Sequence, residues 1–125
     1  TTTEAGLELH PDDCCSPVPK PWSYVYAADT RPCDAVVEAA EEASMLYHEA
    51  TFMTTERDLA LKTYHSTAAE AGAVASQARV DRLLLGHLST RYANARMLAE
   101  EASTTFTGNI EIARRGNLFS LKPKL

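Results

Sequence analysis

The run RLLLGHLSTRY at residues 82–92 constrains the fold more than any other stretch of this sequence. Leu83, Leu84 and Leu85 form an apolar run that is too short for a helix and is bounded by a charge and a turn. Such a run is typical of a buried strand, which we predict over 82–86. His87 then stands where the strand opens into its loop, the place where open α/β sheets bind ligands.

Two earlier segments repeat this arrangement. Residues 22–28, WSYVYAA, are rich in aromatic and β-branched side chains and predict a strand, which Asp29 follows. Residues 44–48, SMLYH, predict another strand, which Glu49 follows. A lone histidine after a strand is more often structural than a ligand, so the repetition carries the functional interpretation.

Helices are predicted between and after these strands. Thr67 and Glu70 have the spacing of a capping box, and small residues recur on one face of the helix that follows. Alternation of strand and helix predicts an α/β layer fold with a mostly parallel sheet. The expected helices cover 34–43, a segment from 67 onward and 94–103, and two short closing strands are expected over 110–113 and 118–121.

Length and composition set the class of protein. A chain of 125 residues suffices for one core, and we expect an irregular lead-in over 1–21 followed by one domain over 22–125. The net charge of −5 argues against nucleic-acid binding through bulk electrostatics. It leaves open a nucleic-acid enzyme in which a metal and a few arginines hold one phosphate.

Cellular location is inferred from cysteines and hydropathy. Cys14, Cys15 and Cys33 are an odd set that suits free thiols in a reducing compartment. No apolar run approaches the roughly 18 residues that span a bilayer, and the first residues lack the pattern of a signal peptide. We therefore expect a cytoplasmic protein with no membrane partner.

The polar residues at the strand ends form a candidate site. Because the carboxyl ends of parallel strands share one edge of a sheet, Asp29, Glu49 and His87 are expected to converge there. Asp29 and His87 suit Zn²⁺ or Mn²⁺. Glu49 and His65 suit an acid–base pair, in which the carboxylate orients the imidazole to donate a proton. Taken singly, Asp29 is better explained as a helix-cap or turn residue and Glu49 as a solvated loop acid, whereas the convergent set favours chemistry.

Arg31 and Arg91 are candidate phosphate ligands. An arginine can bind phosphate through two N–H groups, or it can pair with a surface carboxylate. The sequence leaves these two alternatives open.

Four motifs carry a resemblance to a known family. They are ADTRP at 28–32, HEAT at 48–51, HST at 65–67 and GHLSTRY at 86–92. Their order and spacing resemble the carboxyl-terminal part of ribonuclease Z, the tRNA 3′-processing endonuclease family with a metallo-β-lactamase fold. The resemblance extends from about residue 23 to about residue 106. It implies that the chain is about the second half of an αββα sandwich.

The resemblance also implies roles for individual residues. Asp29 matches an aspartate that bridges two zinc ions, and His87 matches a histidine that holds the second zinc. His65 matches the residue that protonates the leaving 3′ oxygen, and Glu49 the carboxylate that orients it. The resemblance also implies that three residues in the loops of these motifs touch precursor tRNA: Arg31, Ser89 and Arg91. The family cuts just after the discriminator nucleotide and leaves a 3′ hydroxyl on the tRNA.

The sequence departs from the family both in its basic tail over 109–125 and in a missing motif. The HxHxDH motif, which supplies most of the metal ligands, does not occur in these residues. We therefore expect the 125-residue chain alone to bind metal weakly and to leave RNA uncut. Half a sandwich leaves one sheet face uncovered, so we also expect a homodimer or pairing with the upstream half of the same protein.

Two other readings remain. One is a phosphodiesterase of the same fold that acts on other substrates. The other is a non-catalytic module for folding or dimerisation, against which the presence of Asp29, Glu49, His65 and His87 together argues.

Overall fold

Four strands form one parallel sheet in the order β1-β2-β3-β4 in the computed structural model, which describes residues 2–122. All three neighbouring pairs run parallel, which confirms the parallel order expected from the alternation. The strands are β1 (Tyr24–Ala27), β2 (Met45–Glu49), β3 (Arg82–Gly86) and β4 (Asn109–Ile112).

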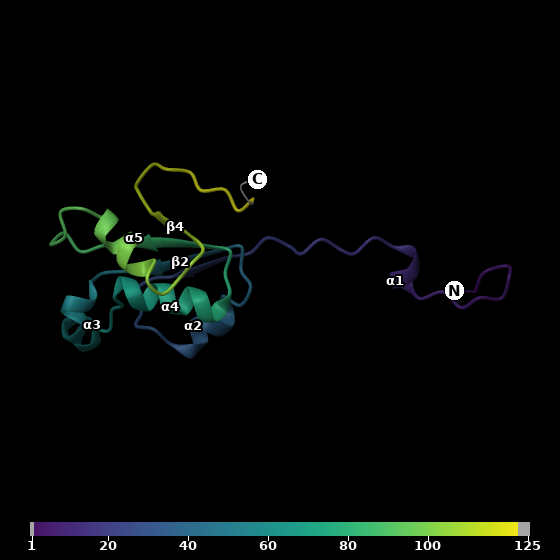
Figure 1. The fold of residues 1–125 in the computed structure, drawn as a ribbon, viewed down its shortest axis with the longest axis horizontal. Coiled ribbons are helices and arrows are strands. Elements are labelled where there is room, and N and C mark those ends of the chain that lie inside the picture. Colours follow the sequence, from purple (N-terminus) through teal and green to yellow (C-terminus); the bar gives the residue numbers. More distant parts are fainter. Residues whose placement is uncertain (1, 123–125) are drawn as a thin grey trace.

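Helices cover one face of this sheet (Figure 1). The core beneath them contains Leu46, Leu83 and Leu85 from alternate positions of the two central strands. None of the helices described in residues 2–122 is long and apolar enough to cross a membrane. The elements are α1 (Pro11–Cys14), α2 (Asp34–Ala39), η1 (Thr54–Glu56), α3 (Arg57–Thr63), α4 (Ala68–Ala78) and α5 (Arg96–Ala102).

Helix α4 packs on β2 and β3 through an inner face of small residues. The predicted capping box is present: the Thr67 hydroxyl accepts from the Glu70 N–H, and the Glu70 carboxylate accepts from the Thr67 N–H. This cap fixes where the helix begins, directly after His65 and Ser66. The alanines of its inner face are completely or almost completely buried: Ala68, Ala71, Ala75 and Ala78.

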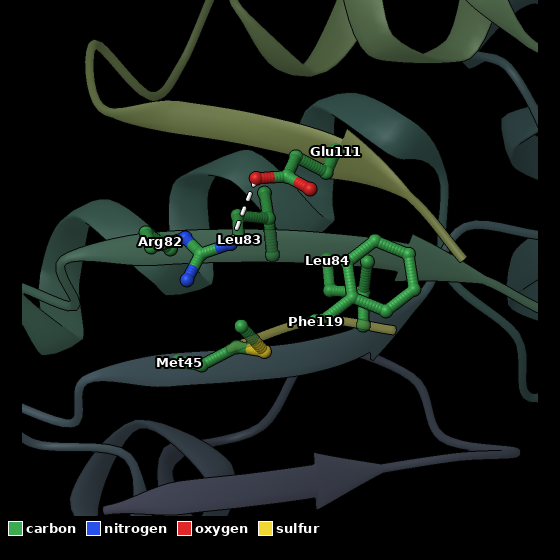
Figure 2. Close-up of a pocket in the computed structure, with 6 residues that line it drawn as sticks. All are labelled: Met45, Arg82, Leu83, Leu84, Glu111 and Phe119. Atoms are coloured by element: carbon green, nitrogen blue, oxygen red, sulfur yellow. Dashed lines mark hydrogen bonds and ion pairs between the residues drawn. The ribbon is translucent and has the colours of Figure 1, made fainter. Parts of the chain in front are cut away.

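The opposite face of the sheet is covered only in part. Met45 and Leu84 are buried there, and Figure 2 shows the ring of Phe119 beside them, where the segment 117–121 crosses the strands. Arg82 holds this segment because its guanidinium donates to the Ser120 carbonyl and pairs with Glu111. Toward β1 this cover ends, and Tyr26 remains 63% exposed.

The end of the chain differs from the prediction. Residues 118–121 form no strand, so the expected closing hairpin is wrong. The apolar side chains of β4 already pack against the core as a parallel neighbour of β3. Phe119 buries its ring over the sheet face instead of along the sheet edge.

One helix ends earlier than predicted. Helix α2 ends at Ala39, four residues before the predicted end, and Glu42 has the positive φ of a turn. The lead-in contains the one-turn helix α1. Pro11 begins that turn, and His10 and Asp13 cap it reciprocally. Figure 1 shows that this segment extends away from the sheet.

Candidate functional site

Four chemically active side chains meet at the carboxyl edge of the sheet. Asp29, Glu49 and His87 follow or end β1, β2 and β3, and His65 immediately precedes the cap of α4. One ligand atom from each of the four lies within 4.8 Å of the others. Segments that are separated by up to 58 residues in sequence therefore build one site, since the sheet is parallel.

Glu49 is the centre of the hydrogen-bond network. Its carboxylate is completely buried, so the reading of a solvated loop acid is wrong. Oε1 accepts from the Thr30 N–H at 2.6 Å and from His65 Nδ1 at 2.7 Å. Oε2 accepts from the Thr51 hydroxyl at 2.7 Å and from the Ser66 N–H at 3.0 Å.

The charge on Glu49 follows from these donors. Burial raises its pKa, but the hydrogen bonds from Ser66, Thr51 and His65 and the charge of His65 outweigh burial and hold the pKa below its ordinary value. The group is therefore a carboxylate near neutral pH, and it accepts at both oxygens.

The residues on both sides of His65 fix its position. The preceding Tyr64 ends α3 in the left-handed conformation, and the Ser66 hydroxyl donates to the Thr30 carbonyl at 2.7 Å. The His65 ring stacks on the His87 ring with centroids 5.1 Å apart. Its Nδ1 is engaged by Glu49, while no hydrogen bond within residues 2–122 engages Nε2. This arrangement orients one ring nitrogen and leaves the other available for proton transfer.

Asp29 and His87 face each other across the edge of the sheet. His87 Nε2 lies 3.2 Å from Asp29 Oδ1, and both side chains are partly open to solvent. Both residues have positive φ, 48° for Asp29 and 55° for His87. Aspartate and histidine adopt this region more readily than most non-glycine residues, and here it turns the chain from each strand end into its loop.

The donor set fits a divalent transition metal. One imidazole nitrogen and one carboxylate oxygen lie 3.2 Å apart, and one ligand atom each of a second imidazole and a second carboxylate lies within 4.8 Å of both. Mixed nitrogen and oxygen ligands of this kind suit Zn²⁺ and Mn²⁺.

A tight loop after β2 places the Thr51 side chain between Glu49 and His87. The Ala50 N–H donates to the Gly86 carbonyl, and the Ser89 N–H donates to the Thr51 carbonyl. The Thr51 hydroxyl lies 2.7 Å from Glu49 Oε2 and 2.8 Å from His87 Nδ1. The sequence analysis assigned no role to Thr51. The HEAT motif does place this hydroxyl two residues after Glu49.

The three candidate RNA contacts lie at the rim of the site. The Arg31 guanidinium lies over the Tyr64 ring, 5.2 Å from its centroid. Arg91 pairs with Glu56 at 3.5 Å and lies over the Phe52 ring. The Ser89 hydroxyl accepts from the Arg91 N–H. Of the alternatives left open above, Arg91 thus has a surface carboxylate partner and Arg31 an aromatic one.

Comparison with known proteins shows which proteins this chain is similar to. No protein-family model matches the chain. The ribonuclease Z of Porphyromonas gingivalis is 40% identical over 114 residues, and that of Haloarcula marismortui is 41% identical over 112 residues. The alignments cover 91% and 89% of this chain but 38% and 36% of the relatives. The chain thus spans little more than a third of their length, in their carboxyl-terminal part.

Solved structures agree with the fold. The metallo-β-lactamase fold protein YhfI from Bacillus subtilis matches with a TM-score of 0.71 and 31% identity, over 77% of this chain and 39% of that one. The short form of human tRNase Z matches with a TM-score of 0.55 and 29% identity, over 72% of this chain and 29% of that one. The sheet and its helices are therefore part of a metallo-β-lactamase fold, as the sequence predicted.

Proposed function

We propose that the chain belongs, as a carboxyl-terminal portion, to the ribonuclease Z family and supplies one half of the active site of a tRNA 3′-end processing endoribonuclease. The reaction is metal-dependent hydrolysis of a phosphodiester in precursor tRNA, with a 3′ hydroxyl left on the tRNA. One observation carries the proposal: two pairs of side chains, Glu49 with His65 and Asp29 with His87, lie together at one site. One ligand atom from each of the four lies within 4.8 Å of the others.

His65 is the proton donor in this proposal. The bond between phosphorus and the 3′ oxygen breaks as a water oxygen joins the phosphorus, and the departing oxygen needs a proton. His65 Nε2 delivers it, because the buried Glu49 carboxylate holds Nδ1 at 2.7 Å and so fixes the ring. Glu49 then compensates the positive charge that the imidazolium carries before transfer.

Asp29 and His87 would hold the metal. Zinc bound there would polarise the phosphodiester and lower the pKa of an attacking water, and two ions are expected in the complete enzyme, with manganese as an alternative. This chain provides two of the protein ligands, and the HxHxDH motif does not occur in its sequence. The isolated chain is therefore proposed to bind zinc weakly and to be inactive.

The proposed partners follow from the same reading. Precursor tRNA would pass along the rim that Arg31, Ser89 and Arg91 form, since arginine side chains bind phosphate well. The uncovered sheet face would pair with the upstream half of the protein or with a second copy. The proposed location is the cytoplasm, where tRNA precursors and reduced thiols are both found.

The test is reconstitution of cleavage. The 125-residue chain would be assayed for zinc content and for cleavage of precursor tRNA, alone and mixed with the upstream portion of a ribonuclease Z relative. Cleavage is expected only on mixing, and His65→Ala is expected to abolish it. His10→Ala is the matched control, because His10 is exposed in the lead-in, and it is expected to retain full cleavage.

Other outcomes identify the alternatives. The structural neighbour with the TM-score of 0.71 is named for its fold and not for tRNA cleavage. A phosphodiesterase with other substrates is therefore the second candidate function. Hydrolysis of a simple phosphodiester without cleavage of precursor tRNA would select that reading. Neither zinc nor cleavage after mixing would select a non-catalytic folding or dimerisation module.

A further inference from the structure

We propose that Thr51 is a positioning residue that fixes the tautomer of His87, so that Nε2 of this histidine is the nitrogen offered to a metal. The inference rests on the proposed role of His87 as a ligand. It goes beyond that role because it assigns the protons of the site to named atoms.

The assignment follows from counting hydrogens. A threonine hydroxyl has one hydrogen to donate, and it lies between Glu49 Oε2 at 2.7 Å and His87 Nδ1 at 2.8 Å. Glu49 accepts from backbone N–H groups at both oxygens, and donors lower its pKa, so it is an ionised acceptor. The Thr51 hydrogen therefore goes to Glu49.

The remaining contact determines the state of His87. With its hydrogen committed to Glu49, the Thr51 oxygen can only accept, so Nδ1 of His87 carries the hydrogen. A neutral imidazole with a protonated Nδ1 has its lone pair on Nε2. That nitrogen faces Asp29 Oδ1 at 3.2 Å with a lone pair on each atom, so the Thr51 and Glu49 bonds have to outweigh this repulsion in the metal-free chain, and a cation bound between the two atoms would remove it.

The position of Thr51 is rigid enough for this task. Its side chain is nearly buried, with 7% of the residue exposed, and its carbonyl accepts from the Ser89 N–H two residues beyond His87. The neighbouring Ala50 N–H donates to the Gly86 carbonyl, one residue before His87. The strand-end loops that carry Thr51 and His87 are thus tied together on both sides of the histidine.

The outcome is a chain of hydrogen bonds between the two pairs. His65 donates to Glu49, Thr51 donates to Glu49, and His87 donates to Thr51. Outer partners of this kind orient a ligand histidine and strengthen metal binding. One hydroxyl therefore couples the proposed proton donor to the proposed metal ligand.

The direct test is nitrogen NMR of the histidine rings in the 125-residue chain, in alkaline buffer without metal. His87 is expected in the Nδ1–H form in the natural chain and in Thr51→Ser, which keeps the hydroxyl. In Thr51→Val, which has the same shape without a hydroxyl, a mixture of both tautomers is expected. Thr104→Val is the matched control, because the Thr104 hydroxyl donates to the Glu101 carbonyl in the turn after α5, an element that supplies none of the four site residues.

Zinc titration gives a second readout. Thr51→Val is expected to weaken Zn²⁺ binding about 10- to 100-fold, whereas Thr51→Ser stays within a few-fold of the natural chain. The amide spectrum of each variant reports whether it is folded, and Thr51→Ser tests the hydroxyl even if Thr51→Val is unfolded.

The outcomes separate this inference from the proposed function. An Nε2–H tautomer in the natural chain, or a pure Nδ1–H tautomer in folded Thr51→Val, would overturn it. So would a Thr51→Ser variant that loses the Nδ1–H form. Failure of tRNA cleavage would leave the tautomer result standing, because the NMR measurement needs neither RNA nor metal.

Discussion

His48 shows at the scale of a single residue how burial alone changes the chemistry of a side chain. It is fully buried on the helix-covered side of the sheet, and its Nδ1 donates to the Glu49 carbonyl at 2.7 Å. Its Nε2 has no hydrogen-bond partner among the described residues. Burial lowers the pKa of His48 and outweighs the charges of Glu49 and Glu70, which raise it.

This residue predicts a loss of stability in acid. Because the folded-state pKa is below the ordinary value of 6.5, the unfolded chain binds a proton first as pH falls. The free energy of unfolding is therefore expected to decrease from about pH 6.5 downward, by up to about 1.4 kcal/mol per pH unit. Denaturant unfolding at a series of pH values measures it.

Variants isolate the contribution of His48. The slope between pH 6.5 and its folded-state pKa is expected to become shallower in His48→Gln, whatever the absolute stability of that variant. His10→Gln should keep the natural slope, because His10 is exposed. An unchanged slope in His48→Gln would contradict the assignment.

At the residue scale the sequence located acids and bases better than it located their partners. Asp29, Glu49 and His87 follow apolar runs, and parallel strands necessarily bring such positions to one edge. Thr51 could not be given a role in the same way. Its two hydrogen bonds depend on how the loop after β2 folds back toward β3, and no periodicity encodes that path.

At the scale of elements, Gly72 sets the distance between α4 and α5. A Cβ built at Gly72 would lie 2.5 Å from the Ala102 carbonyl oxygen and 2.2 Å from the Thr105 hydroxyl oxygen. The hydroxyl belongs to a movable side chain, but the carbonyl is helix backbone. The two helices therefore touch through a position that tolerates no side chain.

Gly72→Ala is expected to destabilise the chain. Helix propensity alone would make alanine better by about 1 kcal/mol. The clash with the Ala102 carbonyl requires α5 to move, and overpacking of this kind costs about 1–3 kcal/mol, so the net change is a loss. Thermal or denaturant unfolding measures it.

Gln77→Ala is the control for this substitution, since Gln77 is exposed on the same helix. It is expected to change stability by no more than about 0.5 kcal/mol. A Gly72→Ala variant that is as stable as the natural chain would mean that α5 does not pack on α4 as closely as described.

The predictability of each element followed from the kind of signal it carried. β3 was predicted at its observed bounds because an apolar run between a charge and a turn has few alternatives, and α4 because its cap is local. The closing hairpin failed because residues 118–121 have strand composition, yet Phe119 lies over the sheet face and Leu118 is 99% exposed. Composition cannot reveal such a long-range contact.

At the scale of the whole molecule, the sheet face opposite the helices is only partly covered. Phe119 covers Met45 and Leu84, as Figure 2 shows, but the cover does not extend across β1. Tyr24 and Tyr26 are 47% and 63% exposed, and Tyr26 stacks on Tyr47 with centroids 4.4 Å apart. Exposed aromatic side chains grouped on one face are typical of a surface that another protein covers.

We expect the isolated chain to cover this face by self-association. β1 is also an edge strand, so its outer backbone groups are available for pairing with a second chain. Light scattering or sedimentation at micromolar concentration should therefore show a dimer, and Tyr26→Lys should shift it toward monomer, because a dimer would bury two unpaired ammonium groups. Leu61→Lys is the matched control, since Leu61 is 66% exposed on α3, outside this face.

A chain that stays monomeric at every concentration, or a Leu61→Lys variant that dissociates equally, would show that the tyrosine face is not the contact. If addition of the upstream portion of a ribonuclease Z relative dissolves the dimer, the same face serves both partners.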